Sequence, residues 1–259
     1  MNKLIIHNRH NQHIAVITEI KERPKGLVII MHWLWSNKEQ LQIIRFAKAF
    51  RDCWFSVVRF DATNSFGESD GKYEDATIEN YYTDLCDVIT WTKQQSWFHT
   101  NFFLAGHSLG GMCSLLYAEA CPEEIKWIVA IAPVISGKLL VEAKGEKRME
   151  HRKKTWRLEK ESMSSPGLIK RLKWSYVENS LKFDVLPKAS ALTMPVLIIV
   201  WSEDASIPPA HQKLLYEQLP WKKELIVLEW VEHNYRDEVT LEKIYAHIQR
   251  WILASAKRN

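Results

Sequence analysis

The chain has 259 residues, of which 46% are hydrophobic and 25% are charged, and its formal net charge is +4. This length and composition suffice for a sizeable core and match one enzyme-sized domain. The longest apolar runs, LVIIM and VLIIVW, have the length of strands, and the first twenty residues hold no run long enough for a secretory signal. A membrane-spanning segment is therefore excluded, and the chain is predicted to be soluble and cytoplasmic.

Strand-like apolar runs recur along the chain, and helical periodicity separates most of the later ones. They cover residues 13–20, 26–31, 54–60, 101–106, 126–132, 195–201 and 224–230. In 77–92, and again near the C-terminus, apolar residues return every three or four positions, as in amphipathic helices packed on a sheet. The alternation predicts an α/β fold, a mostly parallel central sheet with helices on both faces, in a single domain over 1–259.

The segment SNKE at 36–39 has the S-x-x-E spacing of a capping box. It predicts a helix that begins just past Ser36. Only a short loop, His32 to Trp35, would then join this helix to the strand that ends at Met31.

Between Ser136 and about Pro187 the alternating pattern of strands and helices is interrupted. Residues 138–173 contain twelve Lys or Arg and five Asp or Glu, a net charge of +7. The helical, basic character of this stretch predicts an insertion at about 136–187, a small helical cap of two or so helices over the sheet. Its charge has two interpretations, a solvated helical face or the attraction of an anionic substrate or membrane surface.

The sequence GHSLG at 106–110 places one serine, Ser108, between a strand and a helix. This is the context in which G-x-S-x-G indicates a nucleophile elbow. Gly106 and Gly110 lack Cβ atoms, which lets the strand and the helix pass closely. The backbone N–H of Leu109, at the helix N-terminus, would point to where an oxyanion forms. The alternative is a tight turn with a purely structural role.

A serine nucleophile needs a base, and the base needs an orienting carboxylate. After the strand at 195–201 the chain offers Glu203 and Asp204, and after the strand at 224–230 it offers His233. The order Ser, Asp, His, with the carboxylate and the base after the last two strands, is the order expected of this architecture. Other candidates for the carboxylate or the base are disfavoured by their positions in the sequence. They are Asp61, Asp70, His107 and His211.

Between about residues 26 and 254 the chain resembles the α/β hydrolases, specifically the group of esterases, acylglycerol lipases and serine aminopeptidases. Five segments carry the resemblance: MHWLWSNKE, VVRFDATNSFGESDGKYEDATIENYYTDLCDVITW, LAGHSLGGMCSLLYA, WSEDASIPP and EHNYR. The resemblance implies an α/β-hydrolase fold with Ser108 as nucleophile, Asp204 as orienting acid and His233 as general base. It also implies that the cap shapes the acyl or alcohol pocket and that the Leu34 N–H is the second oxyanion donor.

The chain departs from this group in the first oxyanion loop, where relatives carry His-Gly and this chain reads His32-Trp33. Glycine tolerates backbone angles that tryptophan resists, so the loop is expected to be shifted or the pocket partly filled by the indole. Trp33 and Trp35, beside the site, are predicted to line an apolar acyl pocket.

The sequence thus predicts a serine hydrolase that cleaves small-molecule carboxylic esters or thioesters through an acyl-enzyme, with no metal, no organic cofactor, no nucleic-acid partner and no transmembrane segment. Two alternatives remain open. One is a peptidase or aminopeptidase-like hydrolase, although the cap lacks an obvious acidic cluster for a substrate's α-amino group. The other is a catalytically poor ligand-binding module on the same fold. The oligomeric state is left open.

Overall fold

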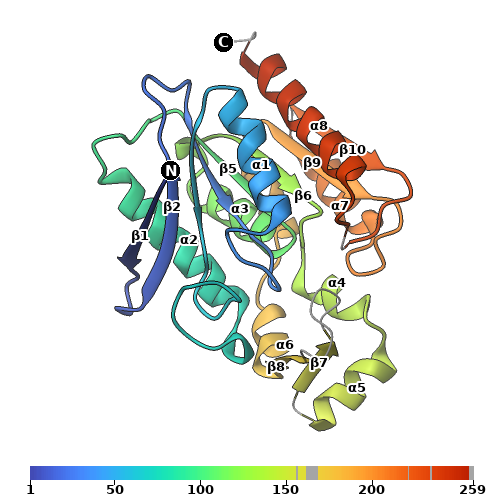
Figure 1. The fold of residues 1–259 in the computed structure, drawn as a ribbon. Coiled ribbons are helices and arrows are strands. Elements are labelled where there is room, and N and C mark those ends of the chain that lie inside the picture. Colours follow the sequence, from blue (N-terminus) through green and yellow to red (C-terminus); the bar gives the residue numbers. More distant parts are fainter. Residues whose placement is uncertain (156, 162–168, 221, 234, 257–259) are drawn as a thin grey trace.

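The computed structural model describes residues 1–155, 157–161, 169–220, 222–233 and 235–256. Its centre is an eight-stranded sheet in the order β1-β2-β4-β3-β5-β6-β9-β10 (Figure 1). The strands are β1 (Asn2–His7), β2 (His13–Glu19), β3 (Leu27–Met31), β4 (Ser56–Phe60), β5 (Phe102–His107), β6 (Ile125–Ile131), β9 (Val196–Trp201) and β10 (Lys223–Leu228). Strand β2 runs antiparallel to β1 and β4, and the other pairs are parallel.

The central strands are buried on both faces because helices cover both sides of the sheet. In β3, Leu27, Ile29 and Met31 face one core, while Val28 and Ile30 face the other. The first core is completed by α2 (Ile78–Lys93), α3 (Leu109–Ala120) and α7 (Pro209–Gln218), and the second by α1 (Leu41–Asp52) and α8 (Glu238–Ala256). The predicted α/β fold is confirmed.

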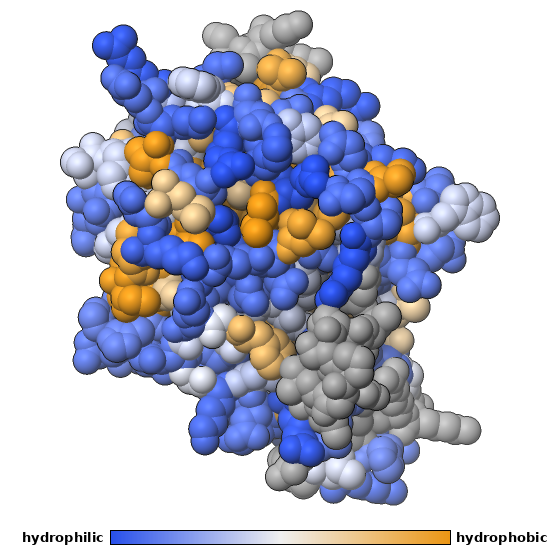
Figure 2. Space-filling model, in the orientation of Figure 1, coloured by the Kyte–Doolittle hydropathy of each residue, from blue (hydrophilic) through white to orange (hydrophobic). Residues whose placement is uncertain are grey.

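Short elements and one edge strand complete this frame. The described residues form 3₁₀ turns at Tyr73–Asp75, Pro122–Glu124 and Leu186–Ala191. The sequence did not predict β1, an edge strand in which Ile6 is the single buried residue. An edge strand that buries so little lacks the apolar pattern on which a prediction depends. On the face drawn in Figure 2 the surface is mostly hydrophilic, with apolar side chains in small groups.

The prediction for the start of α1 is wrong. The helix begins at Leu41, and Gln40 at its N-cap makes no side-chain capping bond. Instead, the backbone N–H and the ammonium of Lys38 both donate to the buried carboxylate of Asp61, each at 2.6 Å. Because this long-range ion pair holds the chain in a turn, the local capping signal at Ser36 is overridden.

The segment between β6 and β9 projects from the sheet (Figure 1). It contains α4 (Gly137–Glu142), α5 (Glu146–Thr155), β7 (Arg157–Glu161), β8 (Ile169–Lys173) and α6 (Ser175–Ser180), and β7 pairs with β8 in an antiparallel two-stranded sheet. The sequence predicted only helices here, so the two strands are a correction. In β8, Leu172 is buried between the exposed Arg171 and Lys173, an alternation that the high density of basic residues concealed.

Candidate active site

Ser108 lies between the end of β5 and the start of α3, with φ 54° and ψ −113°. A positive φ in a residue other than glycine is strained, and neighbouring backbone holds it in place. The Ser108 N–H donates to the Ile131 carbonyl at 2.8 Å, and the Val134 N–H donates to the Ser108 carbonyl at 3.1 Å. The end of β6 and the loop after it therefore fix the turn that presents the serine.

The glycines on either side of Ser108 are required by close packing. A Cβ atom on Gly106 would lie 2.2 Å from the Gly110 carbonyl oxygen, and one on Gly110 would lie 2.4 Å from the Met31 carbonyl oxygen. Real Cβ atoms do not approach backbone this closely. Strand β5 and helix α3 thus pass closely at Gly106, as the sequence predicted. The close approach of β3 to Gly110 was not predicted.

Asp204, after β9, contacts His233, after β10. The distance from His233 Nδ1 to Asp204 Oδ2 is 2.6 Å. The other carboxylate oxygen, Oδ1, accepts the backbone N–H groups of Ser206 at 2.9 Å and Ile207 at 2.8 Å. With both oxygens bonded and the side chain buried, the carboxylate is held in one orientation. It places the proton on Nδ1 and leaves Nε2 of His233 able to accept one.

Glu203 lies next to Asp204 in the sequence but is exposed, and its carboxylate accepts the Ser202 hydroxyl at 3.2 Å. The loop after β9 therefore directs one of the two candidate carboxylates to His233 and the other to solvent.

His32 organises the loop after β3. Its Nε2 accepts the Ala62 N–H at 3.1 Å, so its proton resides on Nδ1, which donates to the Trp33 carbonyl at 2.8 Å. The Ser36 N–H donates to the same carbonyl at 3.1 Å. In a trans peptide the N–H points opposite to the carbonyl, so these two bonds turn the Leu34 N–H to the other side of the loop.

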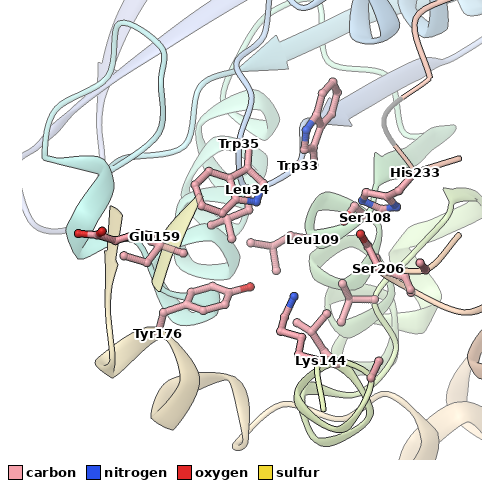
Figure 3. A pocket seen from close by; sticks show the side chains of 16 residues that line it. Trp33, Leu34, Trp35, Ser108, Leu109, Lys144, Glu159, Tyr176, Ser206 and His233 are labelled. Atoms are coloured by element: carbon pink, nitrogen blue, oxygen red, sulfur yellow. The ribbon is translucent and has the colours of Figure 1, made fainter. Parts of the chain in front are cut away.

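Trp33 occupies its position without the strain expected from the sequence. It is not among the non-glycine residues with positive φ, so its backbone does not need glycine. The indole is almost fully buried and packs edge-on against His107, with ring centroids 4.7 Å apart. Trp33 is part of the pocket lining, but its ring projects away from the cavity (Figure 3). Trp35 lies beside the cavity.

A cavity of about 200 Å³ lies between the sheet and the cap. Ser108 and His233 both line it, as do Leu34 and Leu109, the residues of the two predicted oxyanion donors (Figure 3). The remaining lining residues are Trp33, Trp35, Val134, Leu140, Ala143, Lys144, Glu159, Leu172, Tyr176, Ala205, Ser206 and Ile207. All the site residues predicted from the sequence thus gather at this cavity, apart from Asp204, which contacts it through His233.

Six lining residues that sequence reasoning missed come from the insertion: Leu140, Ala143, Lys144, Glu159, Leu172 and Tyr176. Their sequence spacing carries no motif, because they reach the cavity from different helices and strands. The basic character of the segment was the one available signal, and it did not single out Lys144.

His107, beside the nucleophile in sequence, faces the core. Its ring lies 5.5 Å from that of His233, centroid to centroid, and neither of its nitrogens has a hydrogen-bond partner among the residues that the structure describes. Burial holds the pKa of His107 well below its usual range, so the ring stays neutral. A neutral ring adds no positive charge next to His233.

Within the described ranges, no helix has the length and apolarity to cross a bilayer. In the same part of the chain, no three His, Cys, Asp or Glu side chains gather as metal ligands. The cytoplasmic location inferred from the sequence stays a prediction.

Comparisons with solved structures show the same fold. Est1E from Butyrivibrio proteoclasticus, solved with ferulic acid bound, superposes with a TM-score of 0.80 at 20% identity, over 98% of this chain and 99% of that one. The α/β hydrolase domain-containing protein 10 from mouse also gives a TM-score of 0.80, at 17% identity, over 97% of this chain and 98% of that one.

Sequence comparisons find relatives of 25–26% identity and a matching family. An uncharacterised 31.7 kDa protein from the traX-finO intergenic region of Escherichia coli is 25% identical over 222 residues, 74% of this chain and 77% of that protein. Human protein ABHD12B is 26% identical over 196 residues, 74% of this chain and 49% of that protein. The family described as serine aminopeptidase, S33, matches residues 22–174. This match covers more than half of the chain, which therefore belongs to the serine aminopeptidase S33 family and has the α/β-hydrolase fold.

Proposed function

We propose that this hydrolase cleaves small-molecule carboxylic esters or thioesters through an acyl-enzyme formed on Ser108. The observation that carries the proposal is the 2.6 Å contact of Asp204 with His233 on the wall of the cavity that Ser108 also lines. A histidine oriented by a buried carboxylate beside an elbow serine is the arrangement that activates a hydroxyl nucleophile.

The reaction follows from these positions. Ser108 Oγ attacks the acyl carbon while His233 Nε2 takes the hydroxyl proton, and the oxyanion faces the N–H groups of Leu34 and Leu109. His233 then returns the proton to the departing alcohol or thiol, and the acyl group stays on the serine. A water molecule, deprotonated by His233, attacks the acyl-enzyme; the acid leaves and Ser108 regains its proton.

Within the described part of the chain, neither predicted oxyanion donor is bonded to a protein acceptor. Among the described residues no acceptor is bonded to the Leu109 N–H, which is the first of α3 and has no intrahelical partner, or to the Leu34 N–H. Two unused N–H groups at one cavity support the proposed oxyanion hole.

A fluorophosphonate probe tests the proposal, because it reacts with activated serines. We expect labelling of the wild-type protein and none of Ser108→Ala. Ser206→Ala is the matched control, since Ser206 lines the same cavity but lies outside the elbow, and it should keep the label. Absence of labelling in the wild type would favour the ligand-binding module instead.

Peptidase activity is the second candidate, because the family description names serine aminopeptidases. An aminopeptidase needs an anion for the substrate's α-ammonium. Glu159 is a lining carboxylate, but it already accepts Arg171 Nε at 2.9 Å. An anion engaged in this way is a weaker anchor for an α-ammonium, which favours ester over aminopeptidase chemistry. Hydrolysis of methyl butyrate compared with alanine p-nitroanilide decides between them, and faster cleavage of the anilide would favour the peptidase.

A further inference from the structure

The cap contributes a phenol to the cavity. Tyr176, near the start of α6, is only 5% exposed, and its hydroxyl points into the cavity (Figure 3). Burial raises the pKa of Tyr176 above its usual range, so the phenol keeps its proton and acts as a donor. A buried donor directed into a substrate cavity is suited to an oxygen acceptor on the ligand.

The cap also contributes a cation. Lys144, just after α4, is half-buried, and its ammonium extends into the same space as the Tyr176 hydroxyl (Figure 3). Across the cavity from this pair are Ser108 and His233. The reacting groups thus lie on the sheet side and the Lys144–Tyr176 pair on the cap side. The cap also contributes the carboxylate of Glu159, which is paired with Arg171 at 2.9 Å.

The walls between these two sides are apolar. They are formed by Leu34, Leu109, Val134, Leu140, Leu172 and Ile207. The volume of about 200 Å³ is below the range of about 300–1,000 Å³ for pockets that hold drug-sized ligands. The cavity therefore suits a short carbon chain rather than a long acyl chain.

We propose that the Lys144–Tyr176 pair binds a carboxylate at the far end of a short acyl group, so that the preferred substrates are half-esters or half-thioesters of small dicarboxylic acids. The inference rests on the proposed function and specifies its substrate class. An ammonium and a phenol both donate to a carboxylate, and hydrogen bonds to an ionised acceptor are about twice as strong as neutral ones. The apolar walls contact the methylene groups between the two carbonyl carbons.

Paired substrates test the charge directly. Monomethyl glutarate and monomethyl adipate are compared with methyl valerate and methyl hexanoate, in which a methyl group replaces the carboxylate, and hydrolysis is followed by acid release. We expect kcat/KM of the wild type to favour the anionic ester by about 10- to 100-fold, the range for hydrogen bonds to a charged group.

Three variants assign this preference to the pair. Lys144→Met keeps the stem and removes the charge, and Tyr176→Phe keeps the ring and removes the donor; each should lower the ratio of anionic to neutral kcat/KM by about tenfold or more. Lys144→Arg should restore most of the ratio. Lys138→Met is the matched control, because Lys138 is a well-exposed cation of the neighbouring α4 that lies outside the lining, and it should leave the ratio unchanged.

Ionic strength separates a direct contact from long-range attraction by the basic cap. Attraction over the surface is screened within about 8 Å at physiological salt, whereas a contact inside the cavity is screened much less. The preference should persist in 0.5 M salt. If high salt abolished it in the wild type, or if Lys138→Met lowered it as much as Lys144→Met, the binding pair would be overturned.

A binding measurement keeps the inference separate from the reaction. Calorimetry on Ser108→Ala should show tighter binding of free adipate than of hexanoate, and Lys144→Met should remove the difference. Equal binding of the two acids, or equal kcat/KM for the paired esters, overturns the substrate class even if Ser108 is labelled and esters are cleaved. Tight adipate binding without any Ser108-dependent hydrolysis would instead overturn the proposed function alone.

Discussion

His233 Nδ1 lies 2.6 Å from Asp204 Oδ2, and the second oxygen of the same carboxylate accepts two backbone N–H groups. The imidazole is thus oriented by a carboxylate that is itself fixed by the loop after β9. Glu203, one residue earlier, faces solvent. The two neighbouring carboxylates therefore differ in their surroundings because of the direction in which the loop turns them.

The first prediction separates these two carboxylates. Asp204→Asn should lower kcat by about 10⁴-fold, because an amide no longer secures the proton on His233 Nδ1. Glu203→Gln should change kcat less than about twofold. Steady-state kinetics on a short methyl ester measures both, and a larger loss in Glu203→Gln would mean that the acid is wrongly assigned.

The second prediction concerns Trp33. Its ring is buried against His107, so Trp33→Ala should lower the free energy of unfolding by about 3–5 kcal/mol, the cost of a large core truncation. Trp33→Gly should cost at least as much rather than raise kcat through a relaxed loop. Urea unfolding is the measurement, with the highly exposed Trp230→Ala as a control within about 0.5 kcal/mol. A more active Trp33→Gly enzyme of unchanged stability would contradict the packing argument.

The third prediction concerns His32, which turns the Leu34 N–H through its bond to the Trp33 carbonyl. His32→Phe should lower kcat by about 10²- to 10³-fold, the effect of losing one oxyanion donor, with little change in KM. Tyr81→Phe removes the 3.1 Å bond to the Leu34 carbonyl, which belongs to the next peptide, and should have a smaller effect on kcat. Equal losses in both variants would point to general loosening of the loop.

The fourth prediction concerns pH and stability. Burial lowers the pKa of both His32 and His107, so these residues stay neutral in the folded protein while the unfolded chain takes up protons below about pH 6.5. Because the unfolded state then binds more protons, stability is complete above about pH 6.5 and falls as the pH falls.

His107→Phe isolates one of these two groups. It should reduce the slope of unfolding free energy against pH below about 6.5 by up to about 1.4 kcal/mol per pH unit. It should also remove two buried nitrogens that have no hydrogen-bond partner in the described structure. Urea unfolding between pH 5 and pH 8 tests this, and an unchanged slope would mean that His107 is protonated in the folded state.

The sequence by itself determined the alternation of elements and the elbow at Ser108. Buried strands and amphipathic helices each have a characteristic periodicity of apolar residues, and the strained turn between them needs glycines at fixed positions. Residues close together in the sequence therefore suffice to predict these features. The edge strand β1 escaped prediction because it buries a single side chain, and β8 because its buried Leu172 alternates with basic residues.

Only the tertiary structure decided the rest of the site. Asp61 binds Lys38, and α1 begins only after this turn. The Trp33 ring packs on His107, and Lys144 and Tyr176 line one cavity from two separate parts of the cap. Each of these outcomes depends on a contact between residues far apart in the chain. Local sequence propensity cannot predict such partners. The contact contributes free energy only when the fold brings both groups together and removes them from water.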